Sequence, residues 1–166
     1  MSEKGPQATF SNESVTRVGL ISDTHGLLRP EAKQALAGVE RIIHAGDIGA
    51  RSILDELESV APVVAVRGNN DKGEWARSIA DTEIVKIDGV LIFTLHDVKE
   101  LAVDPKASGY AVVIAGHSHR PSIENRDGVL FVNPGSAGPR RFNLPVSLGF
   151  LEIERGAFHA HLRMLL

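Results

Sequence analysis

Aspartate, histidine and asparagine residues recur in this sequence at the points where apolar runs end. The apolar run 19–21 leads directly to Asp23 and His25. Four further blocks of this kind follow along the chain: Ala45-Gly46-Asp47, Arg67-Gly68-Asn69-Asn70-Asp71, Leu95-His96 and Gly116-His117-Ser118-His119. Because strand ends bring the loops that follow them to one edge of a sheet, the pattern predicts a metal site at such an edge.

The candidate ligands combine imidazole nitrogen with carboxylate and amide oxygen. This mixture suits Mn, Fe, Co, Ni or Zn, whereas an oxygen-only set would indicate Mg or Ca. The candidates are Asp23, His25, Asp47, Asn69, His96, His117 and His119. They are too many for one ion but fit two divalent ions if Asp47 bridges them. Two such ions lie roughly 3.5–4 Å apart and can share a hydroxide placed for in-line attack.

The charge of such a centre indicates its substrate. Two divalent ions bound by two carboxylates and by neutral imidazole and amide groups leave a charge of about +2. A bridging hydroxide lowers the charge to about +1, and a phosphodiester monoanion would neutralise it. The expected partner is therefore a small phosphodiester substrate.

The ordered blocks together resemble the calcineurin-like metallophosphoesterase superfamily. The short chain and the later motif Asn133-Pro134-Gly135-Ser136, followed by Pro139-Arg140, are similar to its small prokaryotic YfcE-like phosphodiesterase family. The resemblance implies a two-sheet α/β sandwich that cleaves phosphodiesters, with Mn as the first choice of metal. One metal would be held by Asp23, His25, Asp47 and His119, and the other by Asp47, Asn69, His96 and His117. The residues assigned to catalysis are Asp47, Asn69, Asn70 and His117.

Two positions depart from the pattern of the family. Asn70 stands where many superfamily enzymes carry a histidine that assists the leaving oxygen. An amide cannot act as a general acid near neutral pH, and such assistance is typically worth about 10²–10⁴-fold in rate. We therefore expect a preference for diesters with good leaving groups or internal strain. Asp97 stands where the family usually has glycine, and its side chain could narrow the site or bind a cation.

The first half of the chain alternates apolar strands with short helices. Strands are predicted at residues 15–21, 41–45 and 63–66, and helices at 30–37 and 51–60. This alternation predicts right-handed crossovers and a parallel sheet. In the second half, Asp88-Gly89, Asp127-Gly128 and Arg155-Gly156 are hairpin signals. The expected fold class is α/β: a two-sheet sandwich flanked by helices, parallel in the first half and mostly antiparallel in the C-terminal part.

Length and composition predict one globular domain. The chain has 166 residues, of which 43% are hydrophobic and 23% charged. We expect a single domain at residues 15–166, preceded by a flexible polar arm at residues 1–14. The net charge of −3 gives no reason to expect nucleic acid or an anionic membrane as a partner. The absence of cysteine excludes disulfides and thiolate ligands, and no apolar run approaches the ~20 residues that span a bilayer, so the cytoplasm is the expected location.

The sequence is also compatible with other functions and leaves the roles of several residues open. A retromer subunit resembles this fold and serves as a scaffold with a degraded metal site, but this chain retains every candidate ligand. A nuclease on the same centre and a homo-oligomer are both compatible with the sequence. His44 is interpreted as a hydrogen-bonded core residue, and Asp71 as a loop cap or a partner of a ligand histidine. His159 and His161 are placed on the polar face of a terminal strand, and Arg140 and Arg141 either grip phosphate or lie in a solvated loop.

Overall fold

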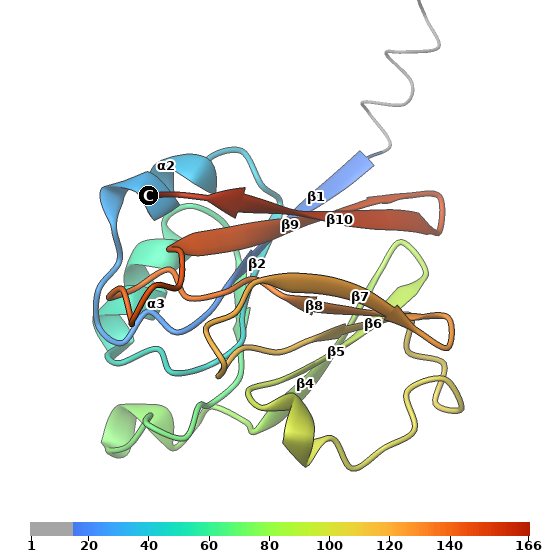
Figure 1. The fold of residues 1–166 in the computed structure, drawn as a ribbon, viewed down its shortest axis with the longest axis horizontal. Coiled ribbons are helices and arrows are strands. Elements are labelled where there is room, and N and C mark those ends of the chain that lie inside the picture. Colours follow the sequence, from blue (N-terminus) through green and yellow to red (C-terminus); the bar gives the residue numbers. More distant parts are fainter. Residues whose placement is uncertain (1–14) are drawn as a thin grey trace, which may run out of the picture.

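The computed structural model describes residues 15–166, so the arm predicted at residues 1–14 lies outside the described part of the chain. Two five-stranded sheets face each other as the layers of a sandwich (Figure 1). The first sheet has the strand order β10-β9-β1-β2-β3, and the second has the order β4-β5-β6-β8-β7. The predicted α/β sandwich is confirmed.

The first sheet contains the predicted parallel strands. Its members are β1 (Val15–Ile21), β2 (Arg41–His44), β3 (Val63–Ala65), β9 (Ser147–Glu154) and β10 (Ala157–Met164). The first three run parallel, and β9 pairs antiparallel with both β1 and β10. The connections carry two α-helices, α2 (Pro30–Ala35) and α3 (Arg51–Glu58). Both helices are shorter than predicted at their C-terminal ends.

The second sheet mixes hairpins with a parallel centre. Its strands are β4 (Thr82–Ile87), β5 (Val90–Leu95), β6 (Val112–Ile114), β7 (Ser122–Arg126) and β8 (Val129–Asn133). The predicted hairpins form, but β6 lies between β5 and β8 and runs parallel to both. Two single-turn 3₁₀ helices, η1 (Glu74–Ala76) and η2 (Val98–Glu100), lie in the connections.

Three apolar clusters hold these layers in place. Leu20 and Ile43 of the first sheet pack against Ile92 and Ile114 of the second, which forms the core between the sheets. The outer face of the first sheet buries a second cluster, which includes residues of α2 and α3 and the fully buried Phe150. A third, smaller cluster covers the outer face of the second sheet. The α-helices therefore flank one sheet only, and the strand ends are anchored by a close-packed interior.

Among residues 15–166, no helix is long and apolar enough to cross a bilayer.

Candidate metal centre

Five strands end at the same edge of the sandwich, and a predicted ligand follows each end. The backbone N–H of Asp23 donates to the Gly46 carbonyl, and that of His117 donates to Asp23 Oδ2, so the two sheets meet here. In chain order, Asp23 follows β1, Asp47 follows β2, Asn69 follows β3, His96 follows β5, and His117 and His119 follow β6. The sequence-predicted edge is therefore the place where these side chains gather.

Asp23, His25 and His119 form the first group of ligand atoms. Asp23 Oδ1 lies 3.3 Å from His119 Nε2 and 3.7 Å from His25 Nε2. The two imidazole Nε2 atoms are 3.4 Å apart. One carboxylate oxygen and two nitrogens thus converge on a single point, which is the geometry that one metal ion requires.

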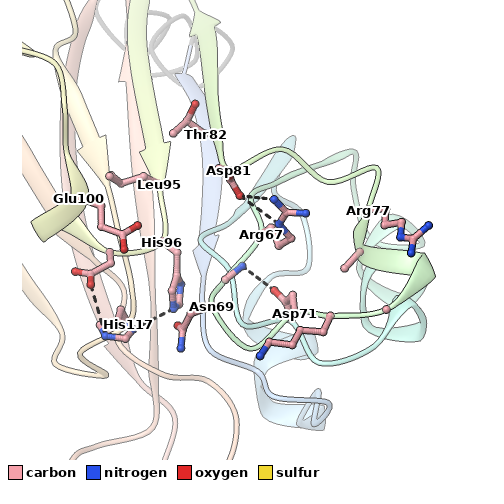
Figure 2. A pocket seen from close by; sticks show the side chains of 15 residues that line it. Arg67, Asn69, Asp71, Arg77, Asp81, Thr82, Leu95, His96, Glu100 and His117 are labelled. Atoms are coloured by element: carbon pink, nitrogen blue, oxygen red, sulfur yellow. Dashed lines mark hydrogen bonds and ion pairs between the residues drawn. The ribbon is translucent and has the colours of Figure 1, made fainter.

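The second group lies on the side of the β5 and β6 strand ends. His117 Nδ1 is 3.3 Å from His96 Nε2, and the two rings meet edge to face. His96 Nδ1 is 2.7 Å from the Ala45 carbonyl oxygen, so this nitrogen carries the proton and Nε2 faces the group. Asn69 lines the same cavity as both histidines (Figure 2).

Asp47 lies between the two groups. Its Oδ2 is 3.6 Å from His25 Nε2 and 3.3 Å from His96 Nε2. Asn70 holds this carboxylate through two hydrogen bonds, with its backbone N–H donating to Oδ1 at 2.9 Å and its amide Nδ2 donating to Oδ2 at 3.0 Å. The Asn70 side chain, which was assigned to catalysis, therefore acts on Asp47 in this structure.

Two buried polar atoms of the site, Asp23 Oδ1 and His119 Nδ1, lack a hydrogen-bond partner. Asp23 is fully buried, and its Oδ1 has no hydrogen-bond partner although three imidazole nitrogens lie within 3.9 Å. An unpaired buried carboxylate oxygen is costly, and a bound cation removes that cost. Carboxylates, imidazoles and an amide match the preferences of Mn, Zn and similar ions. The residues present fit the binding of divalent metal ions.

Most of the candidate ligands have a backbone conformation that is rare outside glycine. Five of the seven predicted ligands have left-handed backbone, with φ between 48° and 72°: Asp23, His25, Asp47, His117 and His119. Such conformations cost free energy in non-glycine residues and cluster at active sites. Gly116 allows the close approach of the β6 loop, because a Cβ there would collide with Ser22 Oγ and lie 2.6 Å from Asp23 Oδ2.

Comparison with known proteins identifies the family. Residues 16–156 match the profile of the calcineurin-like phosphoesterase superfamily domain. The chain belongs to this superfamily. The phosphoesterase is accordingly a hydrolase of phosphate esters whose family implies divalent metal cofactors, and its described residues include groups of candidate metal ligands.

The proteins similar to this chain include phosphodiesterases in sequence and a sorting protein in fold. Phosphodiesterase MJ0936 of Methanocaldococcus jannaschii is 33% identical over 160 residues, which cover 84% of this chain and 94% of the relative. A solved archaeal phosphodiesterase is 31% identical with a TM-score of 0.71, covering 89% of this chain and all of that one. Vacuolar protein sorting 29 from Cryptosporidium parvum has a TM-score of 0.74 at 17% identity, covering 90% and 97% of the two chains. The last likeness shows the fold alone.

In the phosphoesterase without metal, a protonated histidine offsets part of the negative charge of the Asp23 and Asp47 carboxylates. Burial lowers the pKa of His96, but the Asp47 carboxylate and the charge of Asp23 outweigh burial and raise the pKa to about 9. Burial raises the pKa of Asp47, but its contacts with His96 and Asn70 lower it to about 2. His96 is therefore an imidazolium at neutral pH, and metal binding must release the proton on its Nε2, while Nδ1 keeps its proton for the Ala45 carbonyl.

Asp71 is not among the predicted ligands, but it holds two of the ligand-bearing loops together. Its carboxylate is almost fully buried and accepts three backbone N–H groups, from Ile48 and Gly68 to Oδ2 and from Gly49 to Oδ1. These donors belong to the loops that follow β2 and β3, which carry Asp47 and Asn69. The predicted role as a loop cap fits this arrangement, since Asp71 joins two ligand-bearing loops.

A cavity of about 730 Å³ opens beside the second group of ligands (Figure 2). Its walls carry charges of both signs, with Arg67 paired to Asp81 at 2.8 Å and Lys72 and Arg77 nearby. The cavity is large enough for a small organic ligand.

His44 lies behind the centre and binds no ligand atom of it. Thr24 Oγ1 donates to the Ile48 carbonyl and therefore accepts from His44 Nε2–H at 3.0 Å. The Gly46 backbone N–H donates to His44 Nδ1 at 3.1 Å. The hydrogen bond accepted by Nδ1 needs the neutral ring, which fits the predicted role of a core histidine, and burial lowers the pKa of His44 to about 4.

This histidine should make the metal-free protein sensitive to acid. The folded pKa of about 4 lies below the ordinary value of 6.5, so the unfolded chain takes up the proton first. The stability is full above pH 6.5 and falls as the pH approaches 4, by about 3 kcal/mol in total. Urea unfolding of wild type and His44→Gln at several pH values isolates this contribution. An equal slope with pH in both proteins would contradict it.

Proposed function

We propose that the protein is a dinuclear metal-dependent phosphodiesterase that hydrolyses small phosphodiesters. The observation that carries the proposal is the place of Asp47, whose Oδ2 lies within 3.6 Å of His25 Nε2 and within 3.3 Å of His96 Nε2. A single carboxylate between two groups of ligand atoms suits a bridge between two ions. The phosphodiesterase names of relatives at 33% and 31% identity support the same reaction.

The residues of the site would have two roles: some would bind the ions, and others would position the ligands. Bound as a pair, the ions would supply an activated hydroxide as nucleophile and positive charge for the phosphate oxygens. Asp23, His25, Asp47 and His119 would hold one ion, and Asp47, Asn69, His96 and His117 the other. Asn70 orients Asp47, and the Ala45 carbonyl fixes the tautomer of His96. Such partners behind the ligands are needed for precise metal geometry.

The leaving group receives little help from the protein. The Asn70 amide is engaged with Asp47 at 3.0 Å and has no acidic proton to give. Diesters whose leaving oxygen is already a weak base, such as aryl or cyclic nucleotide esters, should therefore react best. A diester monoanion also matches the charge of about +1 expected for the loaded centre. Mn is the first candidate for the metal.

Hydrolysis of two nitrophenyl esters tests the proposal. Metal-stripped protein is assayed with bis(p-nitrophenyl) phosphate and with p-nitrophenyl phosphate, before and after Mn or Zn is added. We expect cleavage that depends on metal and favours the diester. Faster cleavage of the monoester would make the protein a phosphomonoesterase. Metal binding without cleavage of either ester would favour a scaffold role on the fold shared with vacuolar protein sorting 29.

Replacing Asp97 tests whether His117 holds the second metal ion. Its Oδ2 lies 3.6 Å from His117 Nε2, while His117 Nδ1 faces His96. A carboxylate behind a ligand imidazole orients the ring and raises its basicity, so Asp97→Asn should weaken binding of the second ion by roughly ten-fold. The amide can still accept the Lys99 backbone N–H that Asp97 Oδ1 accepts now, which keeps η2 capped.

Calorimetric titration with Mn measures the affinity for the second ion in Asp97→Asn independently of activity. Asp104→Asn is the matched control, because Asp104 also accepts backbone N–H groups in an exposed turn but lies away from the ligands. Unchanged affinity for the second ion in Asp97→Asn would show that Asp97 only shapes the cavity wall.

A further inference from the structure

Two histidines and a glutamate gather on the outer face of the first sheet, next to the β9–β10 hairpin. His159 on β10 pairs directly opposite Glu152 on β9. His161 points to the same face, because side chains two residues apart on a strand share a face. One ligand atom from each of the three residues lies within 4.8 Å of the others. The predicted polar face of the terminal strand therefore carries a compact group of metal-binding atoms.

The three side chains are positioned by their neighbours. Glu152 Oε1 is 3.0 Å from His159 Nε2, while Glu152 Oε2 faces Arg17 Nε at 3.5 Å. The His161 ring stacks on the buried Phe150, with centroids 5.1 Å apart. This stacking fixes the plane of the His161 ring, one nitrogen of which belongs to the group of three ligand atoms.

This group is remote from the candidate metal centre. Glu152 pairs with Arg17 near the start of β1, whereas Asp23 follows the end of that strand. Asp23 is six positions after Arg17, and six steps along an extended chain span roughly 20 Å. The hairpin lies at the end of the sandwich away from the β1–α2 loop (Figure 1). An ion bound here would therefore be additional to the two proposed at the centre.

We propose that Glu152, His159 and His161 form a separate binding site for a divalent ion of the zinc class. Two imidazoles and one carboxylate are a ligand set of open zinc sites, in which water or another group completes the coordination. His159 is 69% exposed, so the remaining coordination position faces solvent. Arg17 and Arg163, which both lie over the Phe150 ring, repel a cation and make this site weaker than the centre.

Zinc binding by the full-length protein tests the site. Equilibrium dialysis against micromolar free zinc is carried out on wild type, His161→Gln and Glu152→Gln, and bound zinc is counted per chain. Glu124→Gln is the matched control, since Glu124 is an exposed strand carboxylate paired with Arg126. We expect each site variant to bind one ion fewer than wild type, with affinity weakened by roughly ten-fold or more, and the control to match wild type.

A site-specific readout separates this proposal from the proposed function. In wild-type protein, zinc should shift the imidazole ¹⁵N resonances of both His159 and His161, whether or not the centre binds two ions. Equal zinc counts in wild type and His161→Gln, or resonances that do not move, would overturn the proposal. Because the variants alter exposed or half-buried side chains, far-UV circular dichroism should confirm that they fold like wild type.

Discussion

Replacing Asp47 with alanine is expected to lower kcat/KM for an activated phosphodiester by about 10³-fold or more. The loss of one preorganised charge-stabilising group commonly costs about 10²–10³-fold, and Asp47 is proposed to hold two ions at once. Its Oδ2 is the atom that lies near both His25 and His96. Removing it should therefore disturb both ions, whereas the loss of a terminal ligand should disturb mainly one.

The metal content of the variant shows why activity falls. Metal-stripped Asp47→Ala is loaded with Mn, dialysed and analysed for metal, and we expect fewer than two ions per chain. Asp55→Ala is the matched control, because Asp55 is an exposed carboxylate on α3 that pairs with Arg51. The control should retain wild-type metal content and activity. Asp47→Asn, which preserves size and removes charge, serves as a second variant if the alanine protein folds poorly.

One result would remove Asp47 from the proposed mechanism. If Asp47→Ala retains two Mn ions and near wild-type activity, the bridge must lie elsewhere in the ligand set. Loss of activity with full metal content would instead show that Asp47 places the nucleophile without being required for metal affinity. Metal analysis and kinetics together therefore distinguish a ligand from a residue that acts only on the reacting atoms.

The predictions that rest on short-range patterns largely agree with the structure, although both α-helices end two residues earlier than predicted. The strand β1 has the predicted bounds, since its apolar run ends at the polar residues that begin the metal loop. The three predicted hairpins form at Asp88-Gly89, Asp127-Gly128 and Arg155-Gly156, and all six turn residues have positive φ. Two-residue turns of this kind require that conformation. Local sequence therefore located both the hairpins and the strand ends that carry the candidate ligands.

Features that depend on distant segments could not be predicted. The parallel pairing of β6 with β5 and β8 is decided by packing between the sheets, which no local pattern specifies. The left-handed backbone of Asp23 and Asp47 is likewise imposed by the contacts of their loops. Asn70 could be identified as a departure from the family, but its two hydrogen bonds to Asp47 required the fold.

Asp71 combines both cases, because the sequence indicates a loop cap but only the fold shows that this residue joins two loops. Its replacement by alanine is expected to have the largest effect on stability. The carboxylate is 4% exposed and accepts backbone N–H groups from Ile48, Gly49 and Gly68. Alanine would leave these donors without their partner. Each hydrogen bond to a charged group contributes about 1.5–3 kcal/mol, and partial relaxation of the loops reduces the sum, so we expect a loss of about 4 kcal/mol. The melting temperature should fall by about 10 °C.

Asp104→Ala is the control that separates the effect of burial on stability from the effect of the hydrogen bonds themselves. Asp104 Oδ1 also accepts two backbone N–H groups, from Lys106 and Ala107, but water can replace it because the turn is exposed. Its loss should lower the free energy of unfolding by about 1 kcal/mol or less in urea unfolding.

Asp71→Ala should in addition weaken Mn binding, because the loops that carry Asp47 and Asn69 are no longer joined. Equal destabilisation by the two variants would contradict the role of Asp71 as a buried link between these loops. A stable Asp71→Ala protein with wild-type metal affinity would show that the loops hold the centre without it.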